Sequence, residues 1–212
     1  MVDTAAYSRS IYFDDTICEV RSVAYDGVWR STVPNPIASY RYDITGASRI
    51  NVVIACTESS GLYYTTDFTA EPLVKFAVTG SNSISNLETW TPERPIYLTD
   101  LTAEDIEDDS FTVTISFESI NGVTYDMDTP LATVSYGKVQ QWTIDNADLH
   151  PYHMHLYHMQ IVTPGGCGAI YYEEGQWFDV IFGRLRLCTV RFNVTDVGGR
   201  TMLECHILQH GD

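Results

Sequence analysis

The chain of 212 residues has few basic residues and no long apolar segment. Its 12 lysines and arginines stand against 28 acidic residues, for a net charge of -16, and only Lys75 and Lys138 are lysines. Nucleic acid and anionic membranes are therefore unsuitable partners, because both require a basic binding surface. The longest apolar runs are about as long as the run at 52–56, which has only about five residues. A membrane-spanning helix needs roughly 20.

The amino terminus has neither the basic nor the apolar region of a signal peptide, so we expect either a protein that is not exported or a natural start further upstream. Five cysteines is an odd number. Bridges Cys18–Cys56 and Cys167–Cys188 would leave Cys205 free for another role. The alternative is five buried free thiols in a reducing compartment.

Convincing helical periodicity is also absent, apart from a possible short acidic turn at 102–109. Apolar and polar residues instead alternate through 111–117 and 188–194, which predicts strands with one face on a core. A third strand at 50–56 is expected to be more buried, because its other face is apolar too. Asn121-Gly122 is a hairpin-turn signal. The predicted class is all-β, with a sandwich-like architecture.

The stretch 79–95 is rich in Ser, Asn, Thr and Pro and lacks periodicity, as is typical of a linker. We therefore divide the chain into a first domain at 1–80, a linker at 81–95 and a second domain at 96–212. The acidic run between Glu104 and Asp109 is interpreted as a solvated loop.

All six histidines fall into two short windows. The first holds His150, His153, His155 and His158, and the second holds His206 and His210 together with Cys205. In a strand, residues two apart share a face, so His153 and His155 can point at one site. Glu204 and His206 likewise share a face, and Cys205 between them points to the opposite one. The dipeptide Cys205-His206 can thus ligate metals on both sides of a strand.

Two imidazoles and one thiolate, from His150, His210 and Cys205, are the ligand set of a blue-copper electron-transfer site. Zinc accepts the same donors, but structural zinc sites usually have four ligands in closely spaced pairs, and one ligand here is distant in sequence from the others. Copper is therefore the expected metal.

These residues carry a family resemblance. HPYHMH at 150–155 and ECHILQH at 204–210 resemble the copper motifs H-P-x-H-x-H and H-C-H-x-x-x-H near the carboxyl end of multicopper oxidases, which include laccases and ferroxidases. The segments 128–149, 175–181 and 189–194 resemble the strands around these motifs. The resemblance implies a cupredoxin-like Greek-key β-sandwich from about Arg94 to Asp212, preceded by the end of another cupredoxin domain.

The resemblance also implies residue roles. His150, Cys205 and His210 would bind a type 1 copper that accepts electrons from the substrate. His153 would bind the type 2 copper, and His155 and His206 the type 3 pair, where O₂ is reduced to water. Electrons would pass from Cys205 to His206 and would enter at His210 or His150. The substrate would be a phenol, an amine, or a metal ion such as Fe²⁺ or Mn²⁺.

The sequence departs from the family pattern in three ways. Glu204 stands where the family has a type 3 histidine; a carboxylate there either binds copper as a harder ligand or marks a lost site. The family's axial type 1 ligand would lie beyond Asp212. The trinuclear copper cluster also needs two His-x-His pairs from an amino-terminal domain, and no histidine precedes His150. We therefore expect a fragment of an extracytoplasmic or secreted oxidase, with the amino-terminal cupredoxin domains as its missing partners.

Two other functions are weighed. A non-enzymatic blue-copper electron-transfer module would explain Glu204 and the missing histidines. A cupin-type iron enzyme built on His153-x-His155 would leave Cys205-His206 unexplained and lacks a suitably placed glutamate. His158 falls outside the ligand pattern and is interpreted as structural or surface. Asn193-Val194-Thr195 matches a glycosylation acceptor but sits in an alternating strand.

Overall fold

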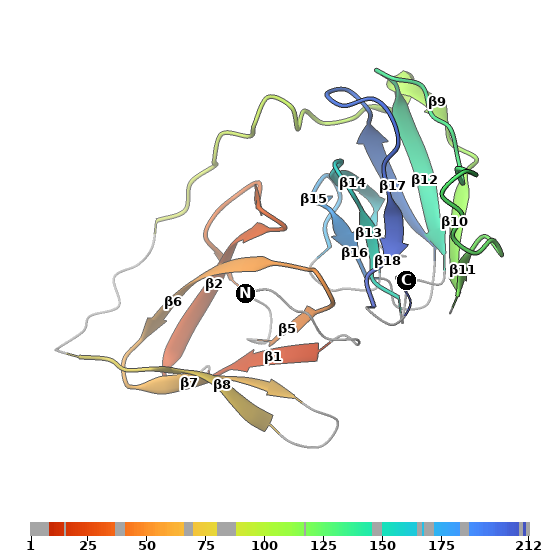
Figure 1. Cartoon of the computed structure of the whole chain (residues 1–212). Helices are drawn as coiled ribbons and strands as arrows, with labels where there is room; N and C mark the ends of the chain where they lie inside the picture. The colour runs from red at the N-terminus through yellow and green to blue at the C-terminus, as the bar shows by residue number, and fades with distance from the viewer. Residues whose placement is uncertain are drawn as a thin grey trace. The chain divides into compact units, whose positions relative to one another are not determined.

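The computed structural model describes residues 9–14, 16–36, 41–65, 70–79, 88–116, 118–145, 150–164, 167, 172–182, 187–207 and 210. Its contacts divide the chain into two compact units, Met1–Arg94 and Pro95–Asp212 (Figure 1). The boundary falls at the carboxyl end of the segment expected to be a linker. Trp90, inside that segment, pairs through its backbone with Val33 of the first unit.

The first unit contains two sheets of mainly antiparallel strands. One sheet has the order β5-β1-β7-β8 and comprises β1 (Arg9–Phe13), β5 (Arg41–Ile44), β7 (Ser60–Thr65) and β8 (Ala70–Phe76). In the other, a single strand pairs with three others: β2 (Cys18–Tyr25) pairs with β3 (Val28–Trp29), β4 (Asn35–Pro36) and β6 (Ile50–Cys56).

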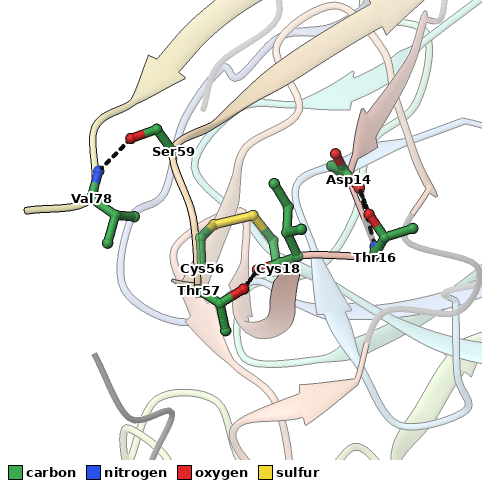
Figure 2. The surroundings of a disulfide bond; sticks show 8 residues. Asp14, Thr16, Cys18, Cys56, Thr57, Ser59 and Val78 are labelled. Carbon is green, nitrogen blue, oxygen red and sulfur yellow. Dashed lines mark hydrogen bonds between the residues drawn. A yellow bond between two sulfur atoms is a disulfide. The ribbon is translucent and has the colours of Figure 1, made fainter. Parts of the chain in front are cut away.

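The predicted strand at 50–56 is β6, with the expected bounds. Its expected deeper burial was wrong, because only Ile50 is buried and Val52–Cys56 are half-buried. Among the described strands β6 pairs with β2 alone, so it is an edge strand. Cys56 lies directly opposite Cys18 in this pairing, and the two form a disulfide (Figure 2).

Hydrogen bonds fix the backbone next to this disulfide. The Thr57 amide donates to the Ile17 carbonyl at 2.8 Å, and the Thr57 hydroxyl donates to the same oxygen at 3.3 Å. Ser59 accepts a bond from the Val78 amide at 3.0 Å, which ties the chain beyond β8 to the start of β7 (Figure 2). The covalent bridge therefore lies next to the short connection through which the chain passes from β6 of one sheet to β7 of the other.

The second unit also contains two sheets. The larger has the order β11-β10-β12-β17-β14-β15, with β9 pairing in parallel with β12. The smaller has the order β16-β13-β18. The strands are β9 (Ile106–Asp108), β10 (Thr112–Ser116), β11 (Ser119–Ile120), β12 (Val139–Asp145), β13 (Tyr152–Met154), β14 (Met159–Thr163), β15 (Trp177–Phe178), β16 (Val180–Ile181), β17 (Cys188–Asn193) and β18 (Leu203–Cys205).

The two strands predicted from alternation in this unit are β10 and β17. Their alternate residues are buried as expected, including Val113, Ile115, Val190 and Phe192. The side chain of Trp142 on β12 packs between Phe111, at a ring distance of 4.5 Å, and Phe192, at 4.8 Å. Alternation therefore located the core of the larger sheet correctly.

Two local predictions are partly confirmed. Asn121 and Gly122 form a tight turn with φ values of 55° and 75°, bridging Ile120 and Val123. The strand that enters this turn is the short β11 rather than β10. The acidic turn is a single 3-10 turn at Ala103–Asp105. Part of the segment expected to be a solvated loop is instead β9.

A second disulfide joins Cys167 to Cys188 at the start of β17. Cys205 is a free, buried cysteine. Of the alternatives left open by the sequence, two bridges and one free thiol is therefore confirmed. Among the described residues, no helix is long and apolar enough to cross a membrane.

Candidate metal centres

The register between β13 and β18 separates the potential ligands onto two faces. Tyr152 lies opposite Cys205, and His153 lies opposite Glu204. Directly opposite residues in an antiparallel pair point to the same face, and neighbours along a strand point to opposite faces. Tyr152 and Cys205 therefore share the buried face. His153 and Glu204 share the other face, where both are half-buried.

The first group of ligands, which we call the thiolate cluster, consists of His150, Cys205 and His210. His150 Nδ1 lies 3.3 Å from Cys205 Sγ. His210 Nδ1 lies 3.7 Å from the same sulfur and 3.3 Å from His150 Nδ1. Three residues up to 60 positions apart thus direct two ring nitrogens and one sulfur at a common point.

The chemistry of the thiolate cluster fits copper. Two imidazoles and one cysteine sulfur form the trigonal donor set of blue-copper sites. Burial raises the pKa of the Cys205 thiol, and a hydrogen bond from the backbone of Ile207 partly opposes this effect. The thiol is therefore protonated at neutral pH without a cation, so a bound metal must displace this proton. The three residues expected from the sequence to share a metal lie together.

The second group, which we call the histidine–glutamate cluster, consists of His153, His155, Glu204 and His206. His155 Nε2 lies 3.0 Å from Glu204 Oε1, and His206 Nε2 lies 3.9 Å from the same oxygen. The His153 ring centroid is 4.9 Å from that of His155 and 5.5 Å from that of His206. Donor atoms of His153, His155 and Glu204 all lie within 4.8 Å of one another.

Backbone bonds hold the members of this cluster in place. The amide of His206 donates to the Pro151 carbonyl at 2.8 Å, and the amide of His155 donates to the Met202 carbonyl at 2.9 Å. His153 Nδ1 donates to the Asp179 carbonyl at 2.9 Å. That bond fixes the ring so that Nε2 is the nitrogen available to a metal. Burial lowers the pKa of His153, which keeps this imidazole neutral and able to act as a ligand.

Asp179 is the supporting residue that sequence reasoning missed. Its carbonyl accepts bonds from both the His153 ring and the Met154 amide. A backbone carbonyl leaves no signature in side-chain patterns, so no signal in one sequence could have found it. His158 belongs to neither cluster; its Nε2 lies 4.0 Å from the Asp179 carboxylate.

The fold and the ligands together define a class of protein. Two β-sheets, with thiolate and imidazole donors gathered on and beside the strands β13 and β18, match the cupredoxin-like β-sandwich of the similar structures. A family model described as multicopper oxidase matches residues 90–212, more than half of the chain. The chain therefore belongs to the multicopper oxidase family.

Solved structures share the fold over nearly the whole chain. A laccase from Pediococcus acidilactici Pa5930 is 19% identical, with a TM-score of 0.74, over 99% of this chain and 46% of its own. The laccase-like multicopper oxidase CueO from Ochrobactrum sp. is 17% identical, with a TM-score of 0.72, over 99% and 52%. A metallo-oxidase from Campylobacter jejuni is 16% identical, with a TM-score of 0.69, over 98% and 50%. The chain spans about half the length of these proteins.

Proposed function

We propose that this chain is the carboxyl-terminal part of a copper-dependent oxidase that takes electrons from a small reducing substrate and reduces O₂ to water. The observation that carries the proposal is the position of Cys205-His206 at the end of β18. Cys205 belongs to the thiolate cluster and the next residue, His206, to the histidine–glutamate cluster. A few covalent bonds therefore link the two clusters, which is the connection that electron transfer between them needs.

Each cluster would have its own task. His150, Cys205 and His210 would hold a type 1 copper in a buried setting, where water is kept from the sulfur. His153, His155 and His206 would supply this chain's share of a trinuclear copper cluster, with Glu204 beside them. Bound copper would provide the one-electron chemistry, and the protein would provide ligand geometry and supporting hydrogen bonds.

The second cluster would be completed by another domain. The side chain of His155 is 45% exposed, and those of His206 and Glu204 are 33% and 22% exposed. Donor groups facing solvent on one side leave room for further ligands from a partner. The family relation and the roughly twofold greater length of the structural neighbours support amino-terminal cupredoxin domains as that partner.

The substrate would be a phenol, an amine, or a metal ion such as Fe²⁺ or Mn²⁺. The similar structures include laccases and a metallo-oxidase, and the Ochrobactrum protein is described as acting on lignin model compounds. The net charge of -16 favours approach of a cation. Two disulfides support an extracytoplasmic or secreted location, where such bonds persist.

The test begins with Cu²⁺ loading of the chain and visible absorption spectroscopy. We expect an intense blue thiolate-to-copper band, its loss in Cys205→Ser, and its retention in the control His158→Gln. A band that survives Cys205→Ser would contradict the assignment of the thiolate cluster. Oxygen consumption with a phenol and with Fe²⁺, measured on the chain joined to its amino-terminal domains, then tests oxidase activity.

One observation favours a second function, a blue-copper electron carrier that does not reduce O₂. Glu204 places a carboxylate among the imidazoles of the histidine–glutamate cluster, at 3.0 Å from His155. A carrier would show the blue band and reversible one-electron reduction but would consume no O₂ with either substrate, even with the amino-terminal domains present.

A further inference from the structure

A pocket in the second unit lies between β9, the beginning of β12 and the segment 132–135. Its volume is about 260 Å³, slightly below the roughly 300 to 1,000 Å³ of pockets that take drug-sized ligands. None of its lining residues belongs to the thiolate cluster or to the histidine–glutamate cluster. β9 lies at one end of the unit and β18 toward the other (Figure 1). The pocket is therefore separate from the candidate metal centres and has room for a small ligand.

Two aromatic rings form part of the pocket wall. They belong to Phe111 and Trp142, whose ring centroids are 4.5 Å apart with an angle of 44° between the rings. Trp142 also packs edge-on against Phe192 at 4.8 Å and is only 5% exposed, so its ring is fixed in position. Aromatic rings attract cations as well as apolar groups, because their faces are negative.

A carboxylate held in a fixed position also lines the pocket. Glu107 Oε2 accepts hydrogen bonds from the Gln140 side-chain amide at 2.8 Å and from the Ser135 backbone amide at 3.3 Å. Gln140 is only 2% exposed, so the side chain that positions Glu107 is itself held in the core. Hydrogen bonds from Ser135 and Gln140 lower the pKa of Glu107, which is therefore ionised at neutral pH. Neither of the two measured bonds uses Oε1, which is left to accept from a ligand.

We propose that this pocket binds a small organic ammonium ion, with its apolar body against Phe111 and Trp142 and its charged nitrogen paired with the Glu107 carboxylate. A second acidic residue, Asp108, also lines the pocket, and the whole chain carries a net charge of -16. Both attract a cation. The inference goes beyond the proposed function, because copper has no part in it.

A divalent metal ion is one competing occupant. Hard cations such as Ca²⁺ bind several oxygen ligands that converge on one point. Asp108 Oδ1 instead accepts bonds from the Ser110 amide at 2.9 Å and the Ser110 hydroxyl at 2.7 Å, whereas Glu107 is held by Ser135 and Gln140. The two carboxylates are thus positioned by different groups, and the aromatic rings offer a metal ion no ligand.

The ammonium group of Lys138 is the other competitor, because it is a cation near Glu107. Of the effects that lower the pKa of Glu107, the charge of Lys138 is the smallest, after the hydrogen bonds from Ser135 and Gln140. Lys138 is exposed and is not among the residues that line the pocket. Its side chain therefore does not occupy the place proposed for the ligand.

The central test is a titration of the full chain with benzylamine, followed by the NMR chemical shifts of the backbone amides. The chain is first freed of metals by a chelator, which is then removed. Benzylamine combines one ring with a protonated nitrogen, and should shift the amides of β9, of 132–135 and of the beginning of β12. Benzyl alcohol lacks the charge and methylamine lacks the ring, so each should bind at least about threefold more weakly. No binding of benzylamine, or equal binding of benzyl alcohol, would overturn the proposal.

Matched variants separate a built site from general attraction to an acidic surface. Glu107→Gln keeps the size of the side chain and removes its charge, and should weaken benzylamine binding by about three- to tenfold. The control Asp109→Asn removes one charge from the same acidic segment but outside the pocket lining, and should leave the affinity unchanged. Phe111→Leu keeps an apolar wall without the ring and should weaken binding by about two- to fivefold. Equal weakening by Glu107→Gln and Asp109→Asn would refute the site.

A parallel titration with Ca²⁺ at constant ionic strength tests the metal ion as occupant. Ca²⁺ should neither shift the same amides nor displace benzylamine. If it does both, the pocket is a metal site and the proposal is wrong. None of these measurements involves copper, so their outcome is independent of the blue band and of oxygen consumption.

Discussion

Tyr152 is a buried tyrosine whose hydroxyl has no hydrogen-bond partner among the described residues. It has no exposed surface and lies opposite Cys205 in the β13–β18 pairing. Burial raises its pKa far above the ordinary value, so the hydroxyl stays neutral. A polar group that gives up its bonds to water without replacing them destabilises the folded state.

Removal of this hydroxyl in Tyr152→Phe should therefore stabilise the protein. An unsatisfied buried polar group costs about 1 to 3 kcal/mol, and the small void left by one oxygen atom reduces the gain, so we expect an increase of about 1 to 2 kcal/mol in the free energy of unfolding. For a protein of this size the corresponding rise in Tm is roughly 2 to 8 °C.

Tyr172 is the matched control, because it is also buried in the second unit but is hydrogen-bonded. Its hydroxyl accepts a bond from the Phe182 amide at 2.8 Å and donates to the Val180 carbonyl at 3.5 Å. Tyr172→Phe leaves that amide unpaired and should lower the free energy of unfolding by about 1 to 3 kcal/mol. The same chemical change is thus expected to have opposite signs at two positions.

Both variants are measured by thermal unfolding of the chain, followed by circular dichroism in the presence of a chelator so that no metal contributes. Urea unfolding gives the free energies independently. If Tyr152→Phe lowers stability as much as Tyr172→Phe does, the reasoning is refuted, because the Tyr152 hydroxyl must then make a stabilising bond.

Three further predictions concern the stability of the individual units. Replacing Cys18 and Cys56 together by alanine should lower the free energy of unfolding, measured in urea, by about 3 to 4 kcal/mol, since the bridge closes a loop with a separation of 38 residues. Equal stability with and without the two cysteines would argue against a stabilising bridge. Gly122→Ala should lower the free energy of unfolding by about 1 to 2 kcal/mol, because φ is 75° at that position and a side chain there is strained. An unchanged free energy of unfolding would exclude this turn geometry. Ile144 lies on central β12 with a fully buried side chain, so Ile144→Ala should lower the free energy of unfolding by about 2 to 5 kcal/mol. Thr112 is exposed, so the control Thr112→Ala should change it by less than about 0.5 kcal/mol. Equal effects of the two variants in thermal unfolding would contradict the assignment of buried and exposed faces.

Alternation in the sequence predicted the core strands of the second unit because each has one face on the core and one in water. The alternating positions of β10 and β17 are buried where the pattern requires it, as Val113 and Val190 show. Burial of β6 was overestimated because an apolar pattern does not reveal whether a strand has one neighbour or two. β9 was missed because its acidic residues have low strand propensity, and its pairing with β12 stabilises it instead.

The division of ligands between the clusters could be predicted from alternation alone, but their distances could not. Cys205 and Glu204 had to point to opposite faces of one strand, and the structure places them so. The partners across the sheet depend on register, a long-range property that no local pattern encodes. The same limit applies to Asp179, which acts through its backbone carbonyl.

Register also explains why the two clusters are distinct. A slip of one residue between β13 and β18 that placed Tyr152 opposite Glu204 would bring His153 opposite Leu203. The imidazole of His153 would then turn toward the core, and the bulky Tyr152 would face solvent beside Glu204. Burial of Tyr152, with no exposed surface, strongly disfavours that slip. Tyr152 therefore helps to fix which candidate ligands meet, although its own hydroxyl lacks a partner among the described residues.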